Sequence, residues 1–171
     1  VLTGSNLAWC HPVLYQRLLA ARSARPEMRV VVIDPRRTAT CEIADLHLPL
    51  APGSDAALFN LVLAALAKRG LTDAGFLQQV TGAATAIATA AASDPALTVL
   101  DPALLARFID LWCRTEKVVT VYSQGINQSA TGTDKVNAII NCHLLTGRIG
   151  REGMGPFSLT GQPNAMGGRE V

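Results

Sequence analysis

The sequence predicts a three-layer α/β fold of the Rossmann-like type, in which helices cover both faces of a mainly parallel β-sheet. Two apolar, β-branched runs, residues 28–33 and 117–123, are continuous rather than alternating, as expected of strands buried on both faces. Helical patterns separate these runs, and strands that alternate with helices favour parallel pairing. The 171 residues are 49% hydrophobic and 16% charged, which suits a domain with a buried sheet.

Three extended segments are expected in the first third of the chain. Residues 1–4 are predicted to end a strand, residues 28–33 to form a strand that Asp34-Pro35 terminates, and residues 47–50 to form a short extended piece. A helix is predicted to start at Pro12, because the N–H that proline lacks has no partner in the first turn. The apolar stripe of this helix consists of Val13, Leu14, Leu18 and Leu19.

Caps and breakers mark the middle helices. Ser54 or Asp55 can cap a helix that Gly70 ends. The core stripe of that helix consists of Leu58, Leu61, Val62, Ala65 and Leu66. Residues 73–93 predict one or two further helices, with a break at Gly82.

The last third predicts a helix, a strand, a loop and a helix. Residues 103–114 form a helix that Asp101 caps, and residues 117–123 form the second clearly buried strand. A loop that turns at Gly125 leads to a helix over residues 135–145. The final stretch is crowded with Gly, Pro, Asn and Gln. We therefore predict an α/β domain over residues 1–155 and an irregular connection to a neighbouring domain over residues 156–171.

Charge and hydropathy argue against several classes of protein. The formal net charge of +2 is too small to favour nucleic acid or a membrane surface as a partner. No apolar run approaches the roughly 18 residues of a transmembrane helix. The start at Val1 lacks both a basic segment and an initiator Met, so we expect the chain to be an internal fragment of a longer protein.

The four cysteines show no metal-binding spacing. They are Cys10, Cys41, Cys113 and Cys142, and no two of them form a C-x-x-C pair. Adjacent Cys-His pairs occur at two of them, but neighbouring residues rarely share one metal. We expect reduced, structural thiols of a cytoplasmic protein and no metal ligand among them.

Polar segments follow the predicted strands at their carboxyl ends, where open parallel sheets bind ligands. Gly4-Ser5-Asn6 offers N–H groups, a hydroxyl and an amide that suit a phosphate, although it lacks the G-x-G-x-x-G fingerprint. Asp34 can accept hydrogen bonds from a ribose and Arg36 can neutralise phosphate. Alternatively, Asp34 only caps a turn and the side chain of Arg36 is solvated.

Two further segments extend this pattern. After Pro52-Gly53, the Asp55 carboxylate can accept from the paired N–H donors of guanine, or it is only a helix cap. Residues 124–129, Gln-Gly-Ile-Asn-Gln-Ser, place three amides around one glycine. Amides both donate and accept, which suits a ligand such as a pterin, while a hydrophilic turn is the alternative. Together the four segments suit one extended ligand.

The motifs "GSN-x-x-x-x-HP", "IDPRRTAT-x-x-ADLHLPL-x-PGSDAAL" and "QGINQSATGTDKVNAIIN-x-HLLTGRIGREGMGPFSLTGQPNAMGGREV" carry a family resemblance. The chain resembles the molybdopterin oxidoreductases, and within them it is most similar to the catalytic subunit of assimilatory nitrate reductases. The resemblance spans nearly the whole chain and is weakest over residues 72–102.

The resemblance implies an enzyme that reduces nitrate to nitrite by a two-electron oxygen-atom transfer. Its cofactors would be molybdenum bis(molybdopterin guanine dinucleotide) and a 4Fe-4S cluster. Its electron donor would be ferredoxin, flavodoxin or an NADH-dependent subunit. Other members of the superfamily, such as formate dehydrogenase or periplasmic nitrate reductase, remain alternatives, as does a stand-alone nucleotide-binding module.

The resemblance also assigns cofactor contacts. They are Gly4, Ser5 and Asn6 at the diphosphate; Asp34 and Arg36 at the ribose and phosphate; Gly53 and Asp55 at the guanine; Gln124 and Gln128, with Gly125 between them, at the pterin; and Gly161, Gln162 and Asn164 in the molybdenum pocket. The cysteine motif of the cluster and the cysteine that ligates molybdenum are not in this sequence. The fragment alone is therefore expected to bind neither metal, to catalyse nothing and to expose apolar surface through which it can self-associate.

Overall fold

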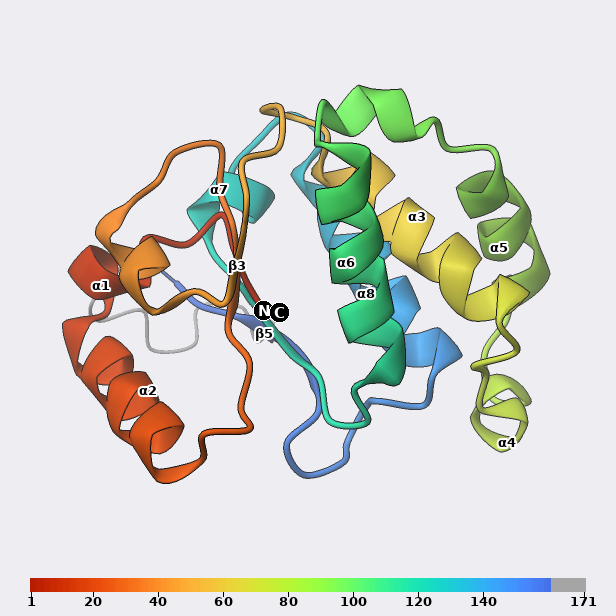
Figure 1. Ribbon diagram of the computed structural model, residues 1–171. Helices are drawn as coiled ribbons and strands as arrows, with labels where there is room; N and C mark the ends of the chain where they lie inside the picture. The colour runs from red at the N-terminus through yellow and green to blue at the C-terminus, as the bar shows by residue number, and fades with distance from the viewer. Residues whose placement is uncertain (161–171) are drawn as a thin grey trace.

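A five-stranded parallel sheet lies at the centre of the computed structural model, which describes residues 1–160 (Figure 1). Its strands are β1 (Leu2–Thr3), β2 (Val31–Ile33), β3 (Leu46–Leu48), β4 (Val119–Tyr122) and β5 (Gly155–Ser158). They lie in the order β3-β2-β1-β4-β5, and all four pairings are parallel. This order is that of a doubly wound α/β fold, so the predicted fold class is confirmed.

Helices cover both faces of the sheet (Figure 1). On one face lie α1 (Leu7–Cys10), α2 (Pro12–Ala24) and the 3-10 helix η1 (Ala39–Ile43). On the other lie α3 (Asp55–Lys68), α5 (Ala83–Ala91), α6 (Pro102–Arg114) and α8 (Gly132–Leu145). The short elements are α4 (Ala74–Leu77), η2 (Pro95–Thr98) and α7 (Gln124–Asn127). None of the helices within residues 1–160 is long and apolar enough to span a bilayer.

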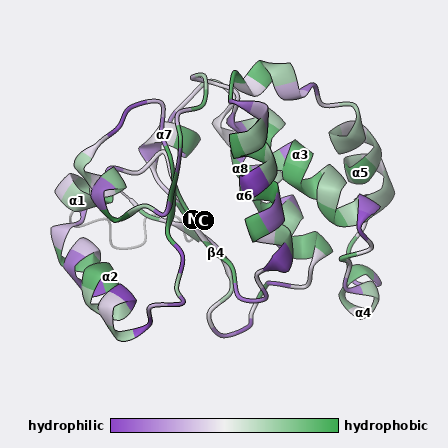
Figure 2. Ribbon diagram, viewed as in Figure 1, coloured by the Kyte–Doolittle hydropathy of each residue, from purple (hydrophilic) through white to green (hydrophobic). Residues whose placement is uncertain are grey.

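The two faces of the sheet carry hydrophobic cores of different size. The larger core joins the sheet to α3, α6 and α8, and its fully buried side chains include Phe59, Phe108 and Trp112. The smaller one, beside α1 and η1, is built around Leu2, Leu7, Val30, Val32, Cys41 and Ile43. In Figure 2 hydrophobic ribbon is concentrated in α3 and α5, whereas α2 mixes hydrophilic and hydrophobic residues.

Most predicted caps and breaks are confirmed. The Asp101 carboxylate accepts a hydrogen bond from the Leu104 N–H at 3.0 Å and caps α6. Gly82 separates α4 from α5 with a φ of 76°, and Gly70 follows α3 with a φ of 68°. Residues 73–93 thus form the predicted pair of helices.

Helix α2 differs from the prediction in what it buries. It begins at Pro12 as expected, but none of its residues is buried. Val13 is 68% exposed, Leu14 39% and Leu19 38%, so most of the apolar stripe faces away from the core, while Leu18 packs partly against it. Trp9 on α1 is 77% exposed on the same side of the sheet. Part of the exposed apolar surface that the sequence leads us to expect thus lies on α1 and α2, and other exposed side chains, such as Val99 and Phe157, lie elsewhere.

Two local predictions were wrong. The segment after β4 is not a loop, because Gln124–Asn127 forms α7. Residues after Gly155 are not all irregular, because Gly155–Ser158 forms β5 beside β4. The edge of β4 offers unpaired N–H and C=O groups, and a neighbouring segment satisfies them by adding a strand. Whether residues 156–171 connect to another domain stays a prediction, and Gly161, Gln162 and Asn164 lie outside the described residues.

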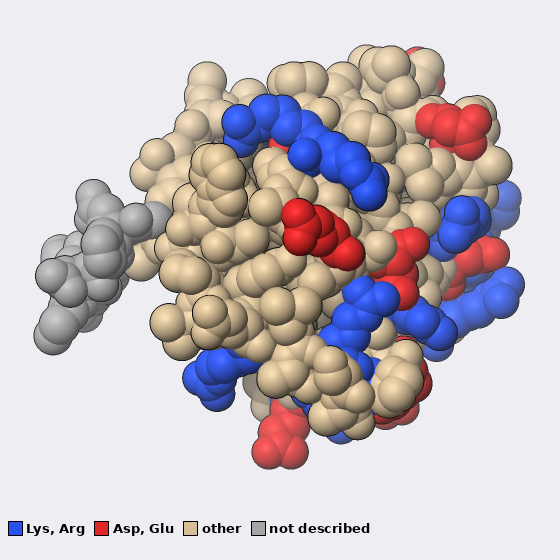
Figure 3. All heavy atoms as spheres, turned by 60° about the vertical axis from the view of Figure 1, so that its left-hand side comes forward, with Lys and Arg blue, Asp and Glu red and all other residues tan. Residues whose placement is uncertain are grey.

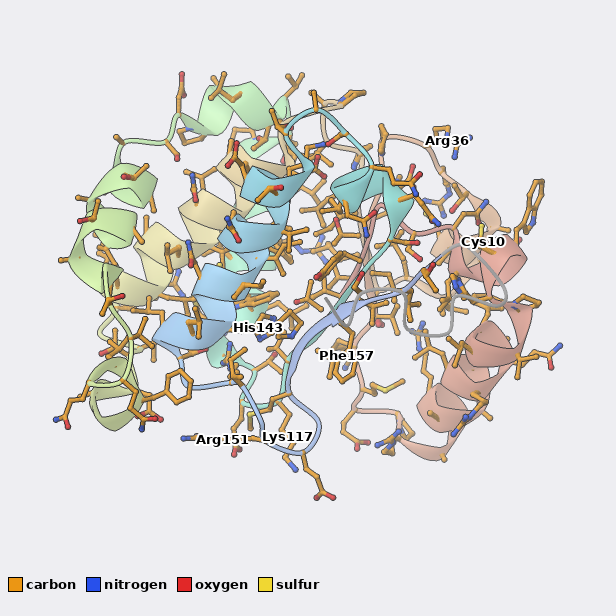
Figure 4. The ribbon with its side chains drawn as sticks, turned by 180° about the vertical axis from the view of Figure 1, so that it is seen from behind. Cys10, Arg36, Lys117, His143, Arg151 and Phe157 are labelled. Atoms are coloured by element: carbon orange, nitrogen blue, oxygen red, sulfur yellow. The ribbon has the colours of Figure 1, made fainter. Side chains whose placement is uncertain are left out.

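His143 on α8 is a fully buried histidine on the side of the sheet that carries the larger core. Its side chain points from α8 toward the sheet (Figure 4), and its Nε2 lies 2.9 Å from the Thr120 hydroxyl. Its ring packs edge-on against Trp112, with ring centroids 5.2 Å apart. Burial, aided by the Arg148 guanidinium, lowers the pKa of His143 from 6.5 to about 3.

We predict that this histidine makes the fold acid-sensitive. The unfolded chain takes up a proton on His143 near pH 6.5, whereas the folded chain does so only near pH 3. Protonation therefore favours unfolding across this window, by up to about 1.4 kcal/mol per pH unit. In urea unfolding, His143→Gln should lose stability less steeply than the wild type between pH 6.5 and pH 3. Parallel slopes for the two proteins would contradict this assignment.

A second prediction concerns the contact between Gly125 and the end of β1. A Cβ atom at Gly125 would lie 2.6 Å from Gly4 Cα, so Gly125→Ala forces the two backbones apart. Overpacking of this kind costs about 2 kcal/mol in the free energy of unfolding. Gly75→Ala on α4 is the matched control, because its Cβ would meet no other side chain or non-local backbone closer than 3.6 Å. Equal stabilities for these two variants in chemical denaturation would refute the prediction.

Candidate functional site

The carboxyl ends of the parallel strands bring the predicted segments to one edge of the sheet. Gly4-Ser5-Asn6 follows β1, Asp34 follows β2, and α7 follows β4. These three strands are neighbours in the order β2-β1-β4, so their ends adjoin. In Figure 4 Arg36 extends from this edge, while Lys117 and Arg151 mark the opposite one. We call the first the carboxyl edge and the second the amino edge.

Two glycines set the geometry at the middle of the carboxyl edge. The Gly125 N–H donates to the Gly4 carbonyl at 3.0 Å, and the Gly4 N–H donates to the Ile33 carbonyl at 3.0 Å. Gly4 has a φ of 55°, in the left-handed region, and a Cβ there would lie 2.8 Å from the backbone of Gly125. Only glycine at both positions permits this approach. The contact ties together the ends of β1, β2 and β4.

Beside Gly4, Ser5 and Asn6 present polar atoms. Ser5 is 3% exposed, and its hydroxyl has no hydrogen-bond partner. The Thr40 hydroxyl donates to the side-chain oxygen of Asn6 at 3.1 Å and accepts the Ala8 N–H at 3.1 Å. This network orients the Asn6 amide and leaves its NH₂ group as the donor for a ligand. Helix α1 that follows is only Leu7–Cys10, so its dipole contributes little here.

The side chains of Asp34 and Arg36 differ in burial and in hydrogen bonding. Asp34 is 7% exposed, and its carboxylate accepts the Arg36 N–H at 2.8 Å, so it does cap the turn. His47 Nε2 lies 2.9 Å from the Asp34 carbonyl oxygen and holds this backbone in place. The Arg36 side chain is 77% exposed, and its Nε is 3.9 Å from the Asp34 carboxylate. Its guanidinium is therefore free to meet an anion at this edge.

Asp55 occupies the first position of α3 but does not cap it. Its carboxylate forms an ion pair with Lys135 of α8, with 2.9 Å between Nζ and Oδ2. The Ser54 hydroxyl donates to the Ala51 carbonyl at 2.7 Å, so neither predicted side chain caps the helix. Gly53 adopts a φ of 92° in the turn before α3, in open surroundings. Both charged side chains of the pair are at least nine-tenths buried.

A hollow of about 230 Å³ lies where β4 and β5 end. Gln124, Asn127 and Gln128 line it together with Ser158. The Ser123 hydroxyl lies 2.6 Å from the Gln124 side-chain oxygen and 2.9 Å from the Leu159 carbonyl, which joins α7 to the end of β5. The hollow therefore has amide donors and acceptors on its walls, as the sequence predicts for this segment.

Within residues 1–160, eight buried side-chain atoms lack a hydrogen-bond partner, and three of them are oxygens in the segments that follow β1, β2 and β4. These three are Ser5 Oγ, Thr38 Oγ1 and Asn127 Oδ1. Buried polar atoms are nearly always hydrogen-bonded in folded proteins, because an unpaired one costs free energy. Ser5 follows β1, Thr38 follows β2, and Asn127 lies in α7 after β4. These three strands are adjacent in the sheet. The position of the three oxygens at neighbouring strand ends fits a polar ligand at this edge.

Sequence reasoning missed some residues of this site. Thr38 and Thr40 lie within the quoted "PRRTAT" segment, directly after Asp34, so their position in the loop was available as a signal. Asn127 was part of the amide-rich segment but was not among the assigned contacts. Lys135 lies within the quoted "ATGTDK" segment, but its pairing with Asp55 gave no signal, because the two are 80 positions apart in the chain. Only packing of α3 against α8 brings them together.

The rest of the surface is less informative. The α1–α2 side carries small groups of both charge signs over a broad uncharged area (Figure 3). Cys10 is exposed while Cys41, Cys113 and Cys142 are buried, and all four are free thiols. Burial raises the pKa of Cys142 above its usual range. Within residues 1–160, no group of three or more His, Cys, Asp or Glu could hold a metal ion.

A hollow of about 680 Å³, larger than the one beside α7, lies at the amino edge rather than at the predicted site. Its lining is mostly apolar and includes Leu18, Val30, Phe108 and Val118. None of the predicted contacts within the described residues lines it. The larger hollow therefore does not coincide with the predicted ligand contacts. These contacts lie at the carboxyl edge, which is the candidate site.

Comparison with solved structures agrees with the observed fold. Acetylene hydratase from Pelobacter acetylenicus superposes with a TM-score of 0.78 at 20% sequence identity, over 89% of this chain and 22% of that chain. At this identity the likeness supports the fold alone.

Comparison of sequences is more specific. The chain is 54% identical to the nitrate reductase of Klebsiella oxytoca, over 100% of this chain and 20% of that protein. It is 32% identical to the periplasmic nitrate reductase of Desulfovibrio desulfuricans, over 98% of this chain and 24% of that protein. It is 30% identical to the F420-dependent formate dehydrogenase subunit alpha of Methanocaldococcus jannaschii, over 98% and 25% of the two chains.

The chain thus spans 20% to 25% of the length of these relatives. A family model described as molybdopterin oxidoreductase matches residues 1–171. The sequence resemblance is therefore confirmed over the full chain, and this protein belongs to the molybdopterin oxidoreductase family.

Proposed function

We propose that this chain is the segment of a molybdenum-dependent nitrate reductase that holds one guanine dinucleotide of a bis(molybdopterin guanine dinucleotide) cofactor. The observation that carries the proposal is the group of buried, unpartnered oxygens of Ser5, Thr38 and Asn127 at the carboxyl edge. An extended ligand with phosphate, sugar and heterocyclic groups supplies hydrogen-bond partners along such an edge. The donors and acceptors present fit that ligand.

Each part of the edge has a role in binding. The backbone at Gly4, with Ser5 and the Asn6 amide, approaches the diphosphate, while Asp34 and the exposed Arg36 guanidinium hold the ribose and phosphate. Gly53 in the turn lets the backbone come close to the guanine, which the Asp55 carboxylate reads.

The hollow beside α7 receives the pterin end. Gln124 and Gln128, on either side of Gly125, offer amides that can both donate and accept. The bound cofactor would supply the two-electron reduction of nitrate to nitrite by oxygen-atom transfer. The residues of this chain bind and orient the cofactor and contain no catalytic group. Gly161, Gln162 and Asn164 are proposed to line the molybdenum pocket where residues 156–171 connect to a neighbouring domain.

Nitrate as the substrate is supported by the relatives. Identity is 54% to a nitrate reductase and 30% to a formate dehydrogenase subunit, so the nitrate assignment is preferred and formate is the second candidate. For the parent enzyme we propose an assimilatory role in the cytoplasm and a 4Fe-4S cluster. Its electrons would come from ferredoxin, flavodoxin or an NADH-dependent subunit.

A self-contained nucleotide-binding module is less well supported. Helix α2 buries none of its residues, and Trp9 and Val13 are 77% and 68% exposed. Exposed apolar surface of this kind marks an interface in soluble proteins. In the parent enzyme other domains would cover it, and in the isolated chain it would promote self-association.

We predict that activity requires the parent enzyme. The parent should contain molybdenum and release GMP on acid hydrolysis, and it should reduce nitrate with a chemical electron donor. The isolated 171-residue chain should do none of these. A parent that turns over formate but not nitrate would support the second candidate, and a parent without guanine nucleotide would overturn the proposal.

Two substitutions test the unpartnered hydroxyls. Ser5→Ala and Thr38→Val each remove a buried oxygen that has no partner, so the cofactor-free parent should keep its melting temperature or gain slightly. The same changes should lower the cofactor content measured as GMP per protein, since each lost hydrogen bond contributes about 1 kcal/mol.

Thr3→Val is the matched control for these variants. The Thr3 hydroxyl is also buried and unpartnered, but Thr3 lies within β1 and is 0% exposed. Its cofactor content should equal that of the wild type. If all three variants retained full GMP content, the carboxyl edge would not be the binding site.

A further inference from the structure

The ion pair between Asp55 and Lys135 is the most deeply buried one among the described residues. Lys135 Nζ lies 2.9 Å from Asp55 Oδ2, and the side chains are 5% and 9% exposed respectively. Other ion pairs, such as that of Arg69 with Asp110, have side chains that are 41% and 43% exposed. Burying two charges is costly, and helix packing alone does not require it.

The position of Lys135 adds to that cost. It lies in the first turns of α8, which begins at Gly132, where the helix dipole disfavours a positive charge. Asp55, by contrast, lies in the first turn of α3, where a negative charge is favoured. The lysine thus stands in an unfavourable place, and what it gains there is contact with one carboxylate. The placement of Lys135 therefore indicates that its role is to hold the Asp55 carboxylate.

We propose that Lys135 is a positioning residue that holds the Asp55 carboxylate in place as a pair of hydrogen-bond acceptors, so that the site selects guanine over cytosine. The inference rests on the proposed function, because it takes Asp55 to be the residue that reads the base. With Lys135 at Oδ2, Oδ1 and a second lone pair remain for a ligand. An ionised carboxylate only accepts hydrogen bonds.

The selectivity follows from the edges of the two bases. Guanine presents N1–H and NH₂ as adjacent donors, which match an acceptor-only carboxylate. Cytosine presents an NH₂ donor beside the N3 acceptor, which would face a carboxylate oxygen without a hydrogen between them. A neutral carboxylic acid, which donates from one oxygen and accepts at the other, matches the cytosine edge instead. Without Lys135, the Asp55 carboxylate would be buried with no positive partner, so its match to the two guanine donors would be lost.

The test compares GDP and CDP binding to the intact parent chain purified without its cofactor. The wild type should bind GDP more tightly than CDP. Lys135→Met should reduce the GDP-to-CDP preference by about tenfold or more, which corresponds to at least about 1.4 kcal/mol. The Lys135→Arg variant should retain the preference for GDP over CDP, because it keeps a positive charge beside Asp55. A purely structural lysine would change both affinities equally.

Two further variants complete the design. Arg69→Met removes an exposed ion pair at the other end of α3 and should leave the preference unchanged. If Lys135→Met does not fold, the double variant Asp55→Leu/Lys135→Met leaves no unpaired charge and should bind GDP and CDP alike.

The outcomes separate the two proposals. A wild type that prefers GDP, together with a Lys135→Met variant that keeps the full preference, would overturn the role of Lys135 and leave the proposed function standing. A wild type without any preference for GDP would overturn the proposed guanine site itself.

Discussion

The close approach of two backbones, at Gly4 after β1 and Gly125 after β4, is the constraint on which the carboxyl edge depends. Hydrogen bonds of 3.0 Å connect Gly4 to Gly125 on one side and to Ile33 on the other. A side chain at either glycine would meet backbone atoms at less than 3.0 Å. Because these ends cannot separate, the segments that follow them share one edge, and Ser5, Asp34 and α7 become neighbours.

The sheet separates two hydrophobic cores of unequal size. Helices α3, α6 and α8 bury large side chains such as Phe59 and Trp112 against one face. On the other face the small core leaves Trp9 and most of the apolar stripe of α2 in solvent, including Val13. One face of the sheet thus carries an extensive core, and the other a small core beside exposed apolar side chains.

The buried polar groups of the carboxyl edge share one property, which is that they do little to stabilise the fold. A stable fold gains nothing from the unpartnered oxygens of Ser5 and Thr38, and little from the buried charges of Asp55 and Lys135. Such features are expected where a ligand, rather than the fold itself, uses them. They lie where parallel sheets bind ligands, and the family to which the chain belongs is named for a pterin cofactor.

The sequence by itself determined the fold class, most helix boundaries and the loops that form the site. Continuous apolar runs, Asp101 as a cap and Gly82 as a break are local signals, and local hydrogen bonds and backbone sterics decide such features. Several features that depend on long-range packing were predicted wrongly or not at all. The exposure of α2, strand β5 and the partner of Asp55 depend on which surfaces meet in space. The Gly4–Gly125 contact and the Asp55–Lys135 pair join residues far apart in the chain, so only the tertiary structure could place them together.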